Sequence, residues 1–248
     1  MAIFDFMASG RGAIQQVLRL VRSLVGREAR PRLDLQCRIE RFGSDYGGWD
    51  VAVEQLDRES VVYSFGIGED VSFDLALIRR FGLTVHGFDP TPRSLRWVRQ
   101  QELPPEFVMH DYGLADRNGL AAFYPPVRTK HVSHSLLPRA GTKDRSITLP
   151  VHRLPAIMQE LGHDRLDLLK LDIEGAEFAV IEDLARSAVR PRQILVEFHH
   201  RFPGVGVART RAAVAALRRL GYGLFAVSDR GVEYGFLLGS RPAAMFPR

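Results

Sequence analysis

Short apolar runs alternate with amphipathic segments along most of this chain. We predict strands for the short runs, which cover Val61–Phe65, Thr84–Phe88, Phe107–His110, Leu120–Tyr124, Leu166–Leu171 and Gln193–Glu197. We predict helices for the amphipathic segments, which cover Ser72–Phe81, Ser94–Gln101, His152–Gly162, Glu177–Arg186 and Ala208–Leu220. Strands that alternate with helices are typical of an α/β protein with a mostly parallel sheet covered on both faces.

The C-terminal part of the chain breaks this alternation. Tyr222–Ser228 and Glu233–Leu238 are both typical of strands, and the turn-rich residues Asp229 to Val232 separate them. We therefore predict an antiparallel hairpin that adds edge strands to the sheet.

The N-terminal part of the chain predicts a helical extension. Between Arg11 and Val25 the apolar residues occupy one helical face, and Arg19 and Arg22 lie on the other. Such a basic amphipathic helix can pack on its own domain, join two copies as a homodimer or lie on a membrane surface. We divide the chain into this extension, residues 1–40, and one α/β domain, residues 41–248.

Composition narrows the class of protein. The chain has 248 residues, of which 46% are apolar and 25% charged, as in soluble proteins. The net charge of +5 comes from scattered basic residues without a dense block, which does not favour a nucleic-acid partner. Cys37 is the only cysteine, which excludes an intrachain disulfide and a multi-cysteine metal site. No apolar run approaches the length of a transmembrane helix, and no signal-peptide pattern is present, so we predict a cytoplasmic protein.

A glycine-rich turn follows the first predicted strand. Gly66 and Gly68 let the backbone turn sharply and approach a ligand, because they carry no Cβ. Asp89 ends the next strand about 20 residues further on, where a carboxylate can accept both hydroxyls of a ribose. Asp111, after the third strand, is placed to accept from an adenine amino group or is an ordinary turn residue. The pattern therefore predicts a nucleoside-containing cofactor.

The residues around the glycine pair discriminate between two cofactors. A dinucleotide site would have a third glycine where Val71 stands, and the carboxylates of Glu69 and Asp70 would repel a pyrophosphate. S-adenosylmethionine carries a sulfonium and an ammonium instead of phosphates, and both tolerate nearby carboxylates. The acidic turn therefore favours S-adenosylmethionine over NAD.

Carboxylates and imidazoles end the two later strands. Asp172 and Glu174 follow Leu171, and Glu197, His199 and His200 end the next strand. The carboxyl ends of parallel strands meet at one edge of the sheet, which is where α/β proteins bind ligands. A histidine or carboxylate there could take the proton of an acceptor hydroxyl during methyl transfer.

Three assignments at this edge stay open. Asp172, Glu174 and Glu197 with a histidine could instead gather a divalent cation, which prefers oxygen ligands, although a metal-free site is favoured. Glu174 could serve the metal, the acceptor or the structure, and we interpret Glu177 mainly as a capping residue at the start of a helix. His134, in the long segment after the third strand, is a candidate acceptor contact.

These motifs together resemble the FkbM family of S-adenosylmethionine-dependent methyltransferases. Lys170 to Glu177 (KLDIEGAE) is similar to the family hallmark, and Tyr63 to Asp74, His86 to Thr91, Glu197 to His200 and the segment from Arg41 to Trp49 resemble the branch of the animal methyltransferase-like proteins. The resemblance implies a Rossmann-like class I methyltransferase with a seven-stranded sheet. It also implies O-methylation of a hydroxyl on a sugar or secondary metabolite.

By the same resemblance, Gly66, Gly68 and Asp89 would hold the cofactor, and Asp172 would lie by its methionine end. Ser64 stands where many methyltransferases have an acid, so the ammonium of the cofactor would need another partner, such as Asp70 or Asp172. Two rival hypotheses remain: a catalytically silent methyltransferase-like scaffold that binds a partner, and an NAD-dependent oxidoreductase.

Overall fold

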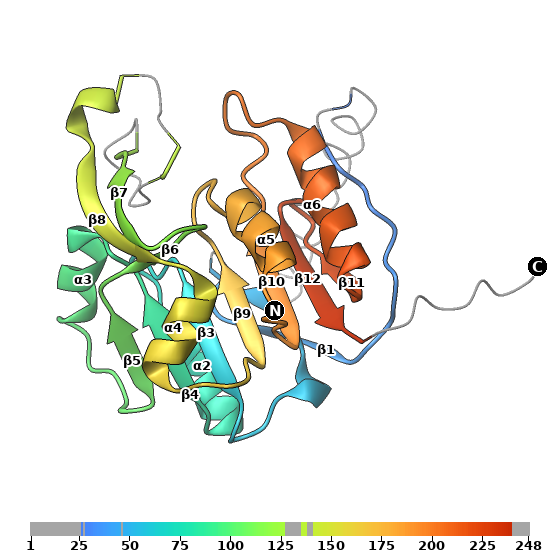
Figure 1. The fold of residues 1–248 in the computed structure, drawn as a ribbon. Helices are drawn as coiled ribbons and strands as arrows, with labels where there is room; N and C mark the ends of the chain where they lie inside the picture. Colours follow the sequence, from blue (N-terminus) through green and yellow to red (C-terminus); the bar gives the residue numbers. More distant parts are fainter. Residues whose placement is uncertain (1–25, 27, 46, 127–134, 138–140, 240–248) are drawn as a thin grey trace, which may run out of the picture.

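The computed structural model describes residues 26, 28–45, 47–126, 135–137 and 141–239, which form a twisted sheet between two layers of helices (Figure 1). The predicted helix between Arg11 and Val25 lies outside the described residues. In the sheet, β11, β12, β10, β9, β3, β4 and β5 are neighbours in that order. Their bounds are β3 Val61–Phe65, β4 Thr84–Phe88, β5 Phe107–His110, β9 Leu168–Leu171, β10 Gln193–Glu197, β11 Tyr222–Val227 and β12 Glu233–Leu238. This confirms the predicted α/β fold with a seven-stranded, mostly parallel sheet.

The predicted hairpin forms, but its strands are not both at the edge. β12 pairs antiparallel with β10 on one side and with β11 on the other. Of the two hairpin strands, β12 is therefore internal and β11 lies at the edge of the sheet. After β10 the chain therefore forms helix α6 and then β11 at the edge of the sheet. It then turns back, so that β12 lies between β11 and β10.

Helices cover both faces of the sheet because the central strands are apolar on both sides. Helices α4, α5 and α6 lie on the face toward the viewer in Figure 1, and α2 and α3 lie on the other. Their bounds are α2 Ser72–Phe81, α3 Pro92–Val98, α4 Leu154–Leu161, α5 Glu177–Arg186 and α6 Val207–Arg219. In β9, for example, Leu169 and Leu171 pack on the side of α4, α5 and α6, and Leu168 packs on the side of α2 and α3. Such alternation explains why each strand is a continuous apolar run.

Two of the helix predictions shift in the structure. α4 begins at Leu154 rather than His152, because Ile147–His152 forms strand β8 and a proline suits the first turn of the helix that follows. α3 begins at Pro92, which is again a proline in the first turn. The sequence pattern missed β8 because Pro150 interrupts its apolar alternation.

Two small sheets flank the main one. β8 pairs with β6 (Gly113–Leu114) and β7 (Gly119–Phe123) above the carboxyl ends of the strands. β1 (Ile39–Phe42) and β2 (Trp49–Ala52) form an antiparallel hairpin that packs with the α2 layer. Short 3-10 turns at Val53–Gln55 and Lys143–Arg145 complete the described elements. The predicted domain boundary after residue 40 falls inside β1.

Candidate active site

A cavity of about 380 Å³ opens at the carboxyl ends of β3, β4 and β9. Its walls combine apolar side chains, glycines and carboxylates. They include Trp49, Phe65, Gly66, Ile67, Gly68, Glu69, Asp70, Phe88, Asp89, Phe123, Leu136, Lys170, Asp172 and Glu174. Five of the predicted cofactor residues, namely Gly66, Gly68, Asp70, Asp89 and Asp172, therefore line one cavity. A pocket of this size with a few converging polar groups is typical of a small-molecule site.

Gly66 is required by the backbone around it. Its φ is 83°, and its N–H donates to the carbonyl of Phe88. A Cβ on Gly66 would lie 1.8 Å from the carbonyl oxygen of Asp172, which is far inside contact distance. Because glycine has no side chain, the ends of β3 and β9 can approach each other closely where the cavity begins.

Asp89 shapes the turn that contains Gly68. One carboxylate oxygen accepts the Gly68 N–H at 2.9 Å, and the other accepts the backbone N–H and the hydroxyl of Thr91 at 2.9 and 2.6 Å. Asp89 is buried at the cavity wall, so these bonds hold its carboxylate in place. The predicted ribose partner is thus preorganised at the tip of β4.

Asp70 fastens the β1–β2 hairpin to the start of α2. Its two oxygens accept the Ser44 hydroxyl and the Ser72 backbone N–H, both at 2.8 Å. Burial alone would raise the pKa of Asp70, but the hydrogen bonds from Ser72 and Ser44 and the charge of Lys170 outweigh it and lower the pKa. Asp70 is therefore a structural carboxylate as well as a cavity residue.

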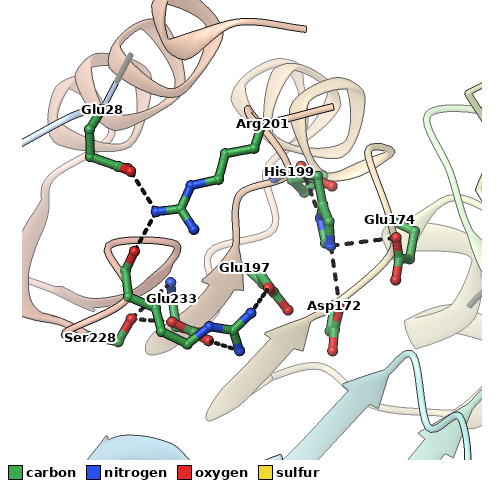
Figure 2. A network of polar contacts seen from close by, with 10 residues as sticks. Glu28, Asp172, Glu174, Glu197, His199, Arg201, Ser228 and Glu233 are labelled. Carbon is green, nitrogen blue, oxygen red and sulfur yellow. Dashed lines mark hydrogen bonds and ion pairs between the residues drawn. The ribbon is translucent and has the colours of Figure 1, made fainter. Parts of the chain in front are cut away.

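An acidic group surrounds His199 at the ends of β9 and β10, as Figure 2 shows. The Nε2 atom of His199 lies 3.9 Å from Asp172 Oδ1 and 3.7 Å from Glu174 Oε2. On its other side, His199 Nδ1 lies 3.5 Å from Glu177 Oε1. Two of the predicted site residues, Asp172 and Glu174, thus come together with the predicted base.

Glu177 does more than cap a helix. It is fully buried, and its two oxygens accept the backbone N–H groups of Gly175 and His199, both at 2.8 Å. These bonds join the loop after β9 to the loop after β10. The interpretation of Glu177 as mainly a capping residue was therefore incomplete, because the side chain connects both halves of the acidic group.

This environment changes the protonation of two of the predicted catalytic residues, His199 and Glu197. Burial opposes charge on His199, but the hydrogen bond and charge of Glu177, with Glu174 and Glu197, raise its pKa to about 10. Burial raises the pKa of Glu197 to about 8, and the charge of Asp172 adds to the effect. His199 is therefore cationic at neutral pH, and Glu197 keeps its proton to a higher pH than an ordinary glutamate.

His200 does not share this site. Its Nε2 lies 2.8 Å from Glu28 Oε1, its Nδ1 contacts the Thr210 hydroxyl at 3.2 Å, and its side chain is fully buried. Glu28 also binds Arg201, which donates to the backbone of Arg230 (Figure 2). Because both ring nitrogens of His200 are engaged, we remove it from the candidate bases.

Glu197 and His199 lie beside Asp172 and Glu174 but do not themselves line the cavity, and three other predicted residues are not brought into it. Asp111 is exposed, and Gly113 and Leu114 line the cavity beside it instead. Ser64 is fully buried within β3, and its hydroxyl has no hydrogen-bond partner. His134 lies outside the described residues.

The segment that follows His134 does reach the site. Ser135 donates its hydroxyl to the carbonyl of Glu174 at 2.6 Å, and Leu136 lines the cavity. Glu174 has a φ of 51°, which is uncommon for a residue with a side chain. The Ser135 bond thus supports the positive-φ backbone of Glu174 at the cavity wall.

Lys170 and Asp74 were not among the predicted site residues. Both are buried charged residues that line the cavity, and Trp49 lies beside Lys170 with 5.7 Å between Nζ and the ring centre. The signal for Lys170 was a charge within the apolar run of β9. The signal for Asp74 was a carboxylate on the apolar face of α2.

The structure changes which residues form the candidate metal site. One ligand atom each of Asp172, Glu174 and His199 lie within 4.8 Å of one another, whereas Glu197 is outside this group. Two ligands of one ion at about 2.1 Å each lie about 3–4 Å apart, which is the separation of His199 Nε2 from both carboxylates.

The strand order, the single internal antiparallel strand and a cavity over the glycine turn define a Rossmann-like methyltransferase domain. The sequence model of the methyltransferase FkbM domain matches residues 60–224. The chain therefore belongs to the FkbM methyltransferase family, which confirms the resemblance found in the motifs.

Individual relatives are more distant. Probable methyltransferase-like protein 24 of Rattus norvegicus is 28% identical over 183 residues, which are 73% of this chain and 42% of that protein. The Homo sapiens protein of the same description is 27% identical over 181 residues, with 72% and 41% covered. The chain spans less than half the length of these curated relatives.

Two solved structures are similar at low identity. The fibrillarin pre-rRNA processing protein of Methanococcus jannaschii has a TM-score of 0.45 at 11% identity, with 75% of this chain and 69% of that one covered. Aeropyrum pernix fibrillarin, solved with S-adenosyl-L-methionine, has a TM-score of 0.40 at 12% identity, with 85% of each chain covered. The family assignment rests on the matched domain and not on these two likenesses. Within the described residues, no helix is long and apolar enough to cross a membrane.

Proposed function

We propose that this protein transfers a methyl group from S-adenosylmethionine to a hydroxyl of a small acceptor, such as a sugar or a secondary metabolite. The observation that carries the proposal is the cavity over Gly66, Gly68 and Asp89, which opens beside the acidic group around Asp172. The cavity suits an adenosyl group, and the acidic group beside it suits acid–base chemistry. The family supports methyl transfer in general, and the choice of acceptor is our own.

The cavity residues fit the donor by their chemistry. Asp89 is held at the wall as a hydrogen-bond acceptor for ribose hydroxyls, and Phe65, Phe88 and Ile67 offer apolar surface for a purine. When bound, S-adenosylmethionine supplies an electrophilic methyl group on a sulfonium. Asp172, at the tip of β9, provides the negative charge that stabilises such a cation.

We assign the proton of the acceptor hydroxyl to Glu197. When the bound donor supplies its methyl group to the acceptor oxygen, a carboxylate oxygen of Glu197 would take the hydroxyl proton. With a pKa of about 8, Glu197 can accept a proton only in its ionised form, so the rate of methyl transfer should rise as the pH increases toward and past 8. The cationic His199, held by Glu177, fixes the orientation of Asp172 and Glu174. Positioning of this kind contributes much of the rate in a displacement reaction.

A divalent cation bound by Asp172, Glu174 and His199 is the second candidate, because the spacing of these three ligand atoms suits one. A cation there would lower the pKa of an acceptor hydroxyl directly. Turnover that survives exhaustive chelation would exclude the cation. Turnover that is lost on chelation and restored by Mg²⁺ or Mn²⁺ would assign the activation of the acceptor hydroxyl to the metal instead of Glu197.

Calorimetric titration with S-adenosylmethionine and with NAD tests the proposal against its rivals. Binding of NAD alone would support the oxidoreductase, and binding of neither would support a silent scaffold. Methyl transfer to a panel of sugars and natural-product glycosides then tests the acceptor class. Glu197→Gln should abolish turnover and retain donor binding, and Glu182→Gln, on the exposed face of α5, is the matched control.

A further inference from the structure

Two buried side chains of opposite charge face the cavity on the side of the β1–β2 hairpin. Lys170 in β9 is 6% exposed, and Asp74 in α2 is 1% exposed. Both line the cavity together with Trp49 and Asp70. Burying charged groups is costly unless they are paired, so this arrangement requires an explanation.

Lys170 is fixed by the backbone but has donor capacity left. Its ammonium donates to the carbonyl of Gly66 at 3.0 Å and, more weakly, to that of Phe65 at 3.4 Å. An ammonium has three N–H donors, and the described residues give Lys170 no ion pair. The remaining donor can serve an anion inside the cavity.

Asp74 has acceptor capacity left. Its Oδ1 atom accepts no hydrogen bond of normal geometry, and the hydroxyl of Ser64, which is likewise without such a bond, lies close enough to interact with the carboxylate. Burial raises the pKa of Asp74 to about 6, although the positive charge of Lys170 and the Ser64 hydroxyl oppose the rise. Unsatisfied buried acceptors are uncommon in folded proteins. An oxygen of this kind at a cavity wall indicates a ligand that donates to it.

The other carboxylates are less suitable partners for an ammonium. Both oxygens of Asp70 already accept hydrogen bonds, from Ser44 and Ser72, and Asp89, whose oxygens accept from Gly68 and Thr91, is the proposed partner of the ribose. Asp172 belongs to the group around His199, on the acceptor side. Asp74 is therefore the carboxylate with a vacant acceptor on the Lys170 side of the cavity.

We infer that Asp74 and Lys170 bind the amino-acid end of the methyl donor, Asp74 taking its ammonium and Lys170 its carboxylate. The inference rests on the proposed function and assigns both charged groups of the amino-acid end, the ammonium and the carboxylate. It also explains how Ser64 can replace the acid that many methyltransferases have at that position: the carboxylate is supplied from α2 instead of β3.

Three adenosyl compounds test this assignment. S-adenosylmethionine carries the carboxylate and the ammonium, and decarboxylated S-adenosylmethionine keeps only the ammonium of these two. Methylthioadenosine lacks both groups and also the sulfonium charge of the other two compounds, so each variant is compared with the wild type for the same compound. Dissociation constants are measured by calorimetry for the wild type, Lys170→Met and Asp74→Asn. Asp183→Asn, which changes a buried carboxylate of α5 outside the cavity lining, is the control.

Lys170→Met should weaken S-adenosylmethionine binding about 10- to 100-fold, as expected for a charge-assisted hydrogen bond, and leave the decarboxylated compound unchanged. Asp74→Asn should weaken both ammonium compounds to a similar extent. Neither variant should change methylthioadenosine binding, which therefore also shows that the pocket is folded.

An equal loss for all three compounds, or no loss in either variant, would overturn the assignment. A wild type that binds S-adenosylmethionine no better than methylthioadenosine would overturn it as well and leave the proposed function standing. A wild type that binds none of the three would contradict the proposed function itself, and the assignment with it.

Discussion

Glu177 offers the sharpest test of how the acidic group is held together. The side chain is fully buried and accepts hydrogen bonds from the N–H groups of Gly175 and His199. Glu177→Ala leaves both donors buried without partners, at about 1–3 kcal/mol each, so we expect a loss of about 3–5 kcal/mol in the free energy of unfolding. Glu177→Gln keeps the shape and one acceptor but loses the charge, so we expect a loss of about 1.5–3 kcal/mol.

The same variants should change the pH dependence of stability. The folded pKa of His199, about 10, lies above its unfolded value of about 6.5. Its stabilising contribution is therefore complete below about pH 6.5 and is lost as the pH rises through about 10. Glu177→Gln removes the main cause of the raised pKa, so stability should decline less over this range than in the wild type.

Urea unfolding between pH 6 and pH 10 measures both effects, and NMR titration of His199 reports the pKa directly. Glu182→Gln controls for loss of an exposed carboxylate on the same helix and should change the free energy of unfolding by less than about 0.5 kcal/mol. If Glu177→Gln is as stable as the wild type and His199 keeps its high pKa, the reasoning about this buried carboxylate is refuted.

Three further predictions concern other parts of the molecule. Gly66→Ala should lower the free energy of unfolding by more than about 3 kcal/mol in a denaturation experiment, since its Cβ would collide with Asp172; Gly68→Ala, which meets open space, should cost about 1 kcal/mol. Burial, with the charges of neighbouring histidines, lowers the pKa of His86 to about 4, so urea midpoints should fall as the pH drops from about 6.5 toward 4, and less so in His86→Gln. Glu197 has a pKa of about 8, so binding of the cationic donor nearby should cause it to release protons, which calorimetry at pH 7.5 in two buffers measures. S-adenosylhomocysteine, whose sulfur is uncharged, should cause less proton release on binding. Equal release with both compounds would contradict the effect.

The fold was largely predictable because the sheet is buried on both faces. Continuous apolar runs identified all seven strands, and the glycine turn and Asp89 marked the edge where the cavity lies. The hairpin was predicted as an edge feature because local patterns do not show which strand fills the gap beside β10. β8 was missed for a different reason, since a proline interrupts its pattern.

The roles of individual polar residues were less predictable. His199 and His200 are adjacent in sequence, yet one faces Asp172 and the other contacts Glu28, which comes from the start of the chain. Only the packing of that distant segment distinguishes them. Asp74 was passed over because a carboxylate in an amphipathic helix is ordinarily exposed, and its burial depends on the close approach of α2 to the sheet.

The fastening of the β1–β2 hairpin has a consequence for the order of folding. The Gln193 side chain, at the start of β10, bonds both the N–H and the carbonyl of Ala52, which is 141 positions away in the chain. This contact fixes the strand that carries Trp49 at the cavity wall. Contacts between distant positions form slowly because a long loop must close first. We therefore expect donor binding to mature late, after β10 has been synthesised and has captured the hairpin.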